Sequence, residues 1–312
     1  MIISVSRRTD IPACFSPWFF NRLNAGEAYY LNPFNAKQAH RVSLKKEDVT
    51  AFVFWTKDPR PMLPNLDRLH GYNYYFHVTI TPYHDDLEPT VGKNKGDIIE
   101  SFKVLSERLG KHRVIWRYDP IIVNKRYTVD FHKKAFSSLA EQLAGYTEQC
   151  IVSFVDLYKT AKKNKAQHGL QELSKDTIHA LMAPFSSIAK GCGLKLQSCS
   201  ENIDLSQYGI EHARCVDDEL IERLVGHRSF NGQKDPNQRG ACGCVQSVDL
   251  GAYNSCQHRC VYCYANFSEP SINKNLSKHH PKSKVLLGEL PKDAKIFDVV
   301  DKCANRDLFN MN

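Results

Sequence analysis

The chain of 312 residues is long enough for one large α/β domain or two small ones. It has no apolar run that would span a bilayer, and its apolar start, residues 1–6, is too short for a signal peptide, so we expect a cytoplasmic protein without membrane contact. The formal net charge of +8 is spread along the chain and allows nucleic acid as a partner. We favour an ordinary solvated surface, because no nucleic-acid-binding motif accompanies the charge.

Short β-like runs alternate with amphipathic stretches along the chain. The expected strands are residues 2–6, 51–55, 74–81, 113–118, 150–155 and 194–198, with a further short strand at 246–250. The expected helices are residues 16–23, 97–109, 129–144, 176–190 and 217–225. Because this alternation produces βαβ units, we predict the α/β class, with a mainly parallel sheet in a single-domain (β/α) TIM-like barrel.

Polar side chains collect where the expected strands end. In a β/α barrel these carboxyl ends form one rim, and that rim carries the active site. The rim candidates are Arg7, Arg8, Lys57, Asp58, Tyr118, Asp119, Ser153, Asp156 and Glu201. Single members such as Asp10 and Asp156 can equally be helix caps, so the prediction rests on the whole set.

Three cysteines near the C-terminal end form a C-x3-C-x2-C motif: Cys256, Cys260 and Cys263, with Tyr262 directly before the last. Thiolates are the usual protein ligands of iron–sulfur clusters, and three so close together can bind three irons of one [4Fe-4S] cluster. One iron would then stay open for a small molecule. A zinc knuckle that includes His258, or a redox C-x-x-C, is an alternative, but neither accounts for Cys256 or Tyr262.

Four further cysteines precede the motif: Cys199, Cys215, Cys242 and Cys244. Since the cytoplasm keeps thiols reduced, clustered cysteines there indicate metal or redox ligands. Four thiolates suit either a second [4Fe-4S] cluster or zinc, and we place iron–sulfur ahead of zinc. The remaining four cysteines are expected to be ordinary core or surface thiols: Cys14, Cys150, Cys192 and Cys303.

The three-cysteine motif resembles that of the radical S-adenosylmethionine (radical SAM) superfamily. Segments 6–13, 54–59, 117–120 and 238–266 also resemble a family catalogued as domain of unknown function 1848, over nearly the whole chain. The resemblance implies a [4Fe-4S] cluster that binds S-adenosylmethionine and cleaves it with one electron from a reductant such as flavodoxin or ferredoxin. The resulting radical would abstract hydrogen from a substrate that the resemblance leaves unassigned.

The order of the elements departs from that of the superfamily, in which the cluster strand usually comes first. Here the strand at 246–250 comes last, so we expect a circularly permuted barrel in which residues 2–6 lie beside it. Residues 1–270 would form the barrel, with 199–266 as its cysteine-rich metal-binding part. Residues 271–312 would form a tail that packs through residues 285–287.

The resemblance and the rim position suggest roles for the candidate residues. The three motif cysteines would bind the catalytic cluster, and Tyr262 would lie near the adenine of the cofactor. Arg7 or Arg8 would bind its carboxylate. The ribose candidates are Asp119, Ser153 and Asp156, the substrate candidates are Lys57, Asp58 and Glu201, and Tyr118 is the candidate hydrogen-atom relay.

Two other functions compete with this reading. One is a zinc-stabilised nucleic-acid-binding module, which predicts zinc at both cysteine groups. The other is an iron–sulfur electron-transfer protein without S-adenosylmethionine cleavage. The polar rim argues against the second, because an electron carrier does not need a polar pocket.

Overall fold

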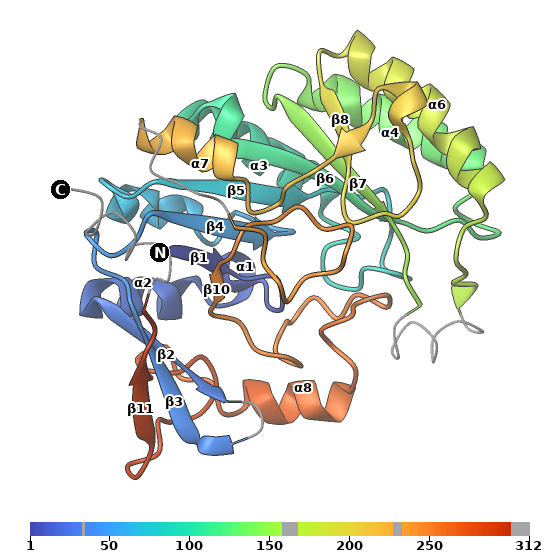
Figure 1. Ribbon diagram of the computed structural model, residues 1–312. Helices are drawn as coiled ribbons and strands as arrows, with labels where there is room; N and C mark the ends of the chain where they lie inside the picture. Colours follow the sequence, from blue (N-terminus) through green and yellow to red (C-terminus); the bar gives the residue numbers. More distant parts are fainter. Residues whose placement is uncertain (33–34, 158–167, 227–232, 301–312) are drawn as a thin grey trace.

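The computed structural model describes residues 1–32, 35–157, 168–226 and 233–300. Its centre is a sheet of eight strands in the order β10-β1-β4-β5-β6-β7-β8-β9, and every neighbouring pair is parallel (Figure 1). The strands are β1 (Ile2–Val5), β4 (Ala51–Thr56), β5 (Tyr74–Thr79), β6 (Val114–Ile121), β7 (Gln149–Phe154), β8 (Lys195–Ser198), β9 (Glu211–His212) and β10 (Val248–Asp249). The predicted α/β class and parallel sheet are confirmed.

The helices α4 (Val129–Leu143) and α6 (Lys175–Gly191) begin where polar side chains cap the backbone. Thr128 caps α4 by accepting from the Phe131 amide at 3.2 Å, and Ser174 caps α6 in the same way. The helices are α1 (Ile11–Cys14), α2 (Ser16–Ala25), α3 (Lys95–Leu109), α4 (Val129–Leu143), α6 (Lys175–Gly191), α7 (Asp218–Val225) and α8 (Glu269–Leu276), with short 3-10 turns η1 (Leu63–Leu69), η2 (Lys111–Arg113) and η3 (Ser206–Tyr208). In the described part of the chain, none of the helices has the length and apolar character needed to cross a membrane.

The strands separate two apolar layers, because successive side chains point to opposite faces of a sheet. One face, the helix face, packs Val5, Phe54 and Trp116 against the core formed with α1 to α6. The other face, which we call the inner face, carries side chains such as Val53 and Ile151. Residues 213–221 and 242–245 cover that inner face, so the segment that carries the second cysteine group packs directly on the sheet.

The first strand of the large sheet in chain order, β1, and the last, β10, lie side by side, as predicted. Ile3 pairs with Val248 and Ser4 with Asp249, which places β10 at the edge of the sheet next to β1. Among the described residues no ladder joins β9 to β10. The expected closure into a TIM-like barrel is therefore not shown, and the architecture is an eight-stranded parallel sheet flanked by helices.

A smaller sheet, not predicted from the sequence, lies beside α2 (Figure 1). It consists of β2 (Glu27–Asn32), β3 (Asn35–Ser43) and β11 (Lys295–Asp298), in the order β11-β3-β2. The tail thus joins the fold through β11, and Val285 and Leu286 are buried as expected. The indole of Trp18 donates to the backbone oxygen of Val285 at 3.1 Å, which fastens the tail to α2.

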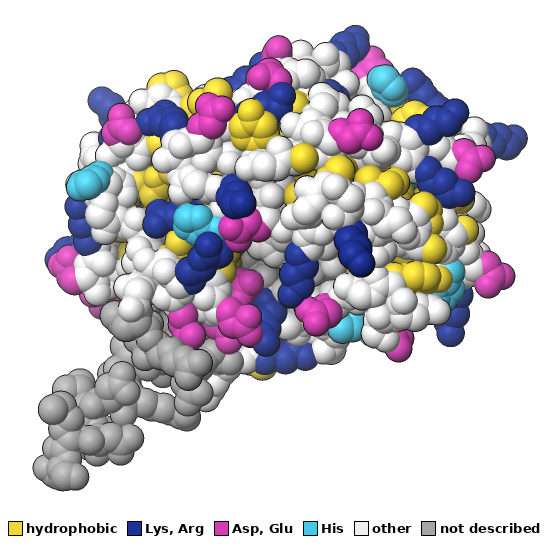
Figure 2. Space-filling model, turned by 90° about the horizontal axis from the view of Figure 1, so that it is seen from above, with side chains coloured by type: hydrophobic (Ala, Val, Ile, Leu, Met, Phe, Trp, Pro, Cys, Tyr) yellow, Lys and Arg dark blue, Asp and Glu magenta, His cyan; other side chains and the backbone are white. Residues whose placement is uncertain are grey.

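Charged side chains of both signs mix on the surface. Figure 2 shows Lys and Arg interspersed with Asp and Glu on the face seen from above. A nucleic-acid footprint requires basic side chains gathered on one face or along one element. The face in Figure 2 does not have this pattern, although the net charge is +8.

Candidate functional site

Asp249, the last residue of β10, fastens this strand to the residues that follow β1. Its carboxylate accepts hydrogen bonds from Ser4 (2.8 Å), Ser6 (2.7 Å) and the amide of Arg7 (2.9 Å), and it pairs with Arg8 at 3.1 Å. Burial alone would raise the pKa of Asp249, but Arg8 and these hydrogen bonds lower it. The carboxylate is therefore ionised and locks the two strand ends together.

The cysteine loop leaves β10 through a close contact that only glycine allows. A Cβ atom on Gly251 would lie 1.9 Å from Oγ of Ser6. Further along, Thr9 donates to the backbone oxygen of Ala252 at 2.9 Å and shares a hydrogen bond with Ser255 at 2.6 Å. The start of the loop is thus held against the segment after β1.

The three motif thiols come together within this loop. Cys256 and Cys263 both interact electrostatically with Cys260 and raise its pKa, and Cys256 also raises the pKa of Cys263. Burial is the main cause that raises the pKa of Cys263 to about 11, while the Ala265 amide donates to its sulfur at 3.4 Å. Lys57, directly after β4, lies close enough to lower the pKa of Cys260 and Cys263. The arrangement is a set of three thiols beside one cation.

Cys14, expected to be an ordinary thiol, instead lies beside Cys256. The ligand atoms of Cys14, Cys256 and His258 all lie within 4.8 Å of one another, so these residues could hold a metal ion. The hydrogen bond between the two thiols raises the pKa of Cys14 and lowers that of Cys256. Cys256 is therefore the thiol that ionises, and Cys14 donates to it.

His258 connects the loop to the segment after β1. Its Nε2 lies 2.8 Å from Oδ2 of Asp10, and its Nδ1 lies 2.9 Å from Oγ1 of Thr90. Burial would lower the pKa of His258, but Cys256 and Asp10 raise it to about 9. Asp10 also caps α1 and accepts from the Lys57 amide at 2.6 Å, so one carboxylate orients three segments.

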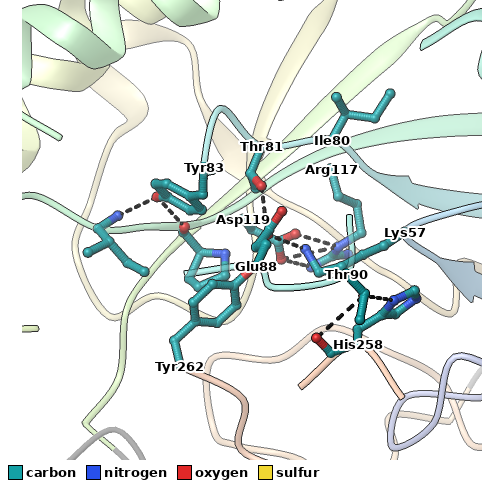
Figure 3. Close-up of polar contacts among 12 residues, drawn as sticks. Lys57, Ile80, Thr81, Tyr83, Glu88, Thr90, Arg117, Asp119, His258 and Tyr262 are labelled. Carbon is teal, nitrogen blue, oxygen red and sulfur yellow. Dashed lines mark hydrogen bonds and ion pairs between the residues drawn. The ribbon is translucent and has the colours of Figure 1, made fainter. Parts of the chain in front are cut away.

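Glu88 lies at the centre of a second group of hydrogen bonds, which connects Lys57 to Tyr262 (Figure 3). Its carboxylate is completely buried and accepts hydrogen bonds from Lys57 (2.8 Å), Lys95, Thr81 (2.7 Å) and the hydroxyl of Tyr262. Burial would raise the pKa of Glu88, but the two lysines lower it strongly. Tyr262 of the motif is thereby held by a fixed negative charge.

The four cysteines of the second group also meet. Cys199 follows β8 directly, Cys215 lies between β9 and α7, and Cys242 and Cys244 precede β10. The sulfurs of Cys199 and Cys215 are 3.3 Å apart, and the thiol of Cys244 interacts with those of Cys215 and Cys242. The hydrogen bond from Cys244 lowers the pKa of Cys242 to about 7.

Donors surround these sulfurs. Nη1 of Arg117 donates to Sγ of Cys215 at 2.9 Å, and the amides of Cys215 and Val216 donate to Sγ of Cys244 at 3.3 and 3.4 Å. Arg117 also donates to both carboxylate oxygens of Asp119 at 3.1 Å (Figure 3). The guanidinium is therefore fixed between a carboxylate and a thiol.

The other rim candidates are spread over the same edge of the sheet. Arg7 donates to Ser247 at 2.7 Å and lies 3.8 Å from Asp235. Ser153 donates to Asp119 at 3.5 Å. Asp156 pairs with Arg239 at 2.5 Å, Glu201 accepts from the Phe154 amide at 2.9 Å, and Asp58 pairs with Arg60 at 2.8 Å.

Tyr118 does not lie at the rim. Strand alternation directs Arg117 and Asp119 to one face of β6 and Tyr118 to the helix face. There its hydroxyl lies 2.7 Å from Nδ1 of His132, and its ring packs edge-on against Phe136. This position does not fit the role of hydrogen-atom relay that we expected for Tyr118.

Several site residues were missed in the sequence. Glu88, Thr90 and Lys95 follow β5 without any motif that would mark them. From the sequence alone Cys14 is expected to be an ordinary thiol, because free cysteine behaves as a small hydrophobe. Its place at the end of α1, the helix that follows β1, is the signal that would have found it, because β1 pairs with β10, the strand before the motif.

The fold and the site define a class: a parallel α/β protein that gathers two groups of cysteine side chains near the carboxyl ends of its strands. More particularly, the chain belongs to the family described as Domain of unknown function (DUF1848), which matches residues 2–265. This confirms the family resemblance. No curated protein matches the chain.

Proposed function

We propose that the protein is a radical SAM enzyme with Cys256, Cys260 and Cys263 as ligands of a [4Fe-4S] cluster. The observation that carries the proposal is the convergence of these thiols in one loop fastened beside β1, next to the Lys57 ammonium. When bound, such a cluster supplies the electron that cleaves S-adenosylmethionine, giving a radical that abstracts hydrogen from the substrate. With its cluster strand last, the enzyme would have a circularly permuted order.

The donor set suits an iron–sulfur cluster. Three thiols share one loop, a backbone amide donates to Sγ of Cys263, and Lys57 offsets thiolate charge. Groups that hydrogen-bond to ligands in this way orient them and tune the metal. Cys14 fits the scheme as a donor to Cys256, because its own pKa is raised and it stays protonated.

The surrounding residues would hold the ligand loop and the cofactor. With its pKa of about 9, His258 is protonated at neutral pH and stabilises the Cys256 thiolate. Glu88 fixes Tyr262, which would face the adenine. Arg7 is the better candidate for the cofactor carboxylate, because its ion pair with Asp235 is longer, at 3.8 Å, than the 3.1 Å pair of Arg8 with Asp249.

Polar groups further along the carboxyl edge of the sheet would contact the ribose of the cofactor and the substrate. Asp119 and Ser153 are neighbours through a 3.5 Å hydrogen bond and would contact the ribose hydroxyls. Asp156 and Glu201 interact electrostatically, and burial is the main cause that raises the pKa of Glu201. These two carboxyl groups, Lys57 and Asp58 would face the substrate. Asp156 and Asp58 are each paired with an arginine, Arg239 and Arg60 respectively.

The test is anaerobic reconstitution with iron and sulfide, followed by dithionite and S-adenosylmethionine. We expect 5′-deoxyadenosine from the wild-type protein and none from a variant with all three motif cysteines replaced by alanine. Cys192→Ala, which removes a partly buried thiol outside both groups, is the matched control and should behave as wild type.

Two outcomes would overturn the proposal. An iron-loaded wild-type protein that makes no 5′-deoxyadenosine would point to electron transfer. A protein that retains zinc and takes up no iron at the motif would point to the zinc-stabilised module. The reductant in the cell would be a flavodoxin or ferredoxin type of electron donor.

A further inference from the structure

We propose that Cys199, Cys215, Cys242 and Cys244 bind a second iron–sulfur cluster, closed by four thiolates. This inference does not depend on S-adenosylmethionine chemistry at the first site. The four cysteines come from three separate segments, and the parallel sheet brings the segments after β8 and β9 together at one edge. A segment that precedes β10 then adds the last two thiols.

The sulfurs form a continuous set in space. Cys199 lies 3.3 Å from Cys215, Cys215 interacts with Cys244, and Cys244 interacts with Cys242. Three of the four are buried, and Cys199 is half-buried. Buried thiols scattered by chance would not converge from positions so far apart in the chain, so the set is a built site.

The environment favours a negatively charged group. A four-iron cluster with four thiolate ligands is anionic, and hydrogen bonds to its sulfurs stabilise it. The site supplies the Arg117 guanidinium at 2.9 Å from Cys215 and two amide donors to Cys244 at 3.3 and 3.4 Å. Arg117 is itself nearly buried, which strengthens its field at the sulfurs.

Four thiolates from separate segments can close a [4Fe-4S] cluster without any other ligand. Four thiolates also suit a single zinc ion, whose sulfurs lie within about 4 Å of one another, and the sulfurs of Cys199 and Cys215 are 3.3 Å apart. The experiment therefore measures zinc beside iron.

A metal here would also explain how an irregular segment stays folded. Residues 233–247 contain no strand or helix, yet Cys242, Cys244 and Val245 are buried against the inner face of the sheet. A cluster would link this segment to the ends of β8 and β9. Metal binding of this kind contributes directly to folding free energy.

The experiment uses the full chain with Cys256, Cys260 and Cys263 replaced by alanine, which removes the first site. After anaerobic reconstitution we expect about four irons and four sulfides per chain, with the broad visible absorption of an iron–sulfur cluster. Adding Cys242→Ser and Cys244→Ser to this variant should abolish the iron. Adding Cys192→Ala instead should leave it unchanged.

If the variant that lacks the three motif cysteines does not fold, iron per chain is measured instead in proteins that keep the motif. Wild type should then bind about eight irons per chain, and Cys242→Ser with Cys244→Ser should lower this to about four. Zinc in place of iron, or no metal in the chain that keeps only the second group, would overturn the inference. Neither result would bear on 5′-deoxyadenosine formation at the first site, so the two proposals fail separately.

Discussion

The buried charge of Glu88 provides the sharpest test of the network around the motif. We consider Glu88→Gln, which keeps the size of the side chain and removes its charge. The carboxylate has 0% exposure, while the lysine side chains of Lys57 and Lys95 are 15% and 21% exposed. Removing one partner of a buried pair typically costs about 3 to 5 kcal/mol, because the remaining charge is left uncompensated.

We expect a loss near the lower end, about 3 kcal/mol, since both lysines retain some contact with water. The measurement is urea unfolding of the anaerobically purified protein, followed by tryptophan fluorescence. Glu100→Gln is the matched control: it breaks the exposed pair with Lys103 on α3 and should cause no measurable change. Tyr262 would also lose its charged acceptor, so iron uptake at the motif should fall.

The pH dependence separates this explanation from simple loss of packing. In wild type, Glu88 raises the pKa of Lys57 despite its burial. Without Glu88, burial would hold that pKa below its ordinary value of 10.5, so the unfolded state would bind more protons than the folded state. The variant should then recover stability as pH rises from about 7 to about 10. A loss below about 1 kcal/mol at neutral pH, or one that does not shrink on raising the pH, would refute the reasoning.

Three further outcomes follow from the structure. Cys14→Ser should keep the iron at the motif and leave the yield of 5′-deoxyadenosine within about twofold of wild type. Loss of iron would instead mean that Cys14 is a fourth ligand, so that no iron of the cluster stays open for a small molecule. Tyr118→Phe should leave the yield of 5′-deoxyadenosine unchanged and lower stability by about 1 kcal/mol, because the hydrogen bond to His132 is lost. If the folded variant made no product, Tyr118 would act as the hydrogen-atom relay after all. Burial lowers the pKa of His132 to about 4, so the unfolded state takes up the proton before the folded state does. Stability should therefore fall by about 2 kcal/mol as the pH decreases from about 7 to about 5. His132→Gln should remove that part of the slope in urea unfolding, and an unchanged slope would contradict the assignment.

The sequence predicted features that depend on local pattern and on the order of the elements. The expected strand at 51–55 is β4 (Ala51–Thr56), and the expected helix at 129–144 is α4 (Val129–Leu143). The pairing of β1 with β10 was also predicted, from the order of the elements and not from local pattern. These features follow from periodicity and from the rule that sequential β and α elements build a parallel sheet.

What the sequence did not predict depends on contacts between distant segments. The small sheet was missed because β11 pairs with β3 from the far end of the chain, and strand preference depends strongly on such partners. Glu88 was missed because its position becomes meaningful only when Lys57, Lys95 and Tyr262 converge on it. Tyr118 was misplaced because a strand-end position does not by itself say which face a side chain takes.

The two cysteine groups are connected by a line of alternating charges across the sheet edge. Arg117 donates to Cys215 and pairs with Asp119, Asp119 raises the pKa of Lys57, and Lys57 lowers that of Cys260. Charge placed at either thiol group therefore changes the field at the other through fixed, mostly buried side chains. Because such coupling is reciprocal, a negative cluster bound at one group would alter the affinity of the other group for a cluster by the same free energy in both directions. The side chains that hold the sites thus also make them one electrostatic unit.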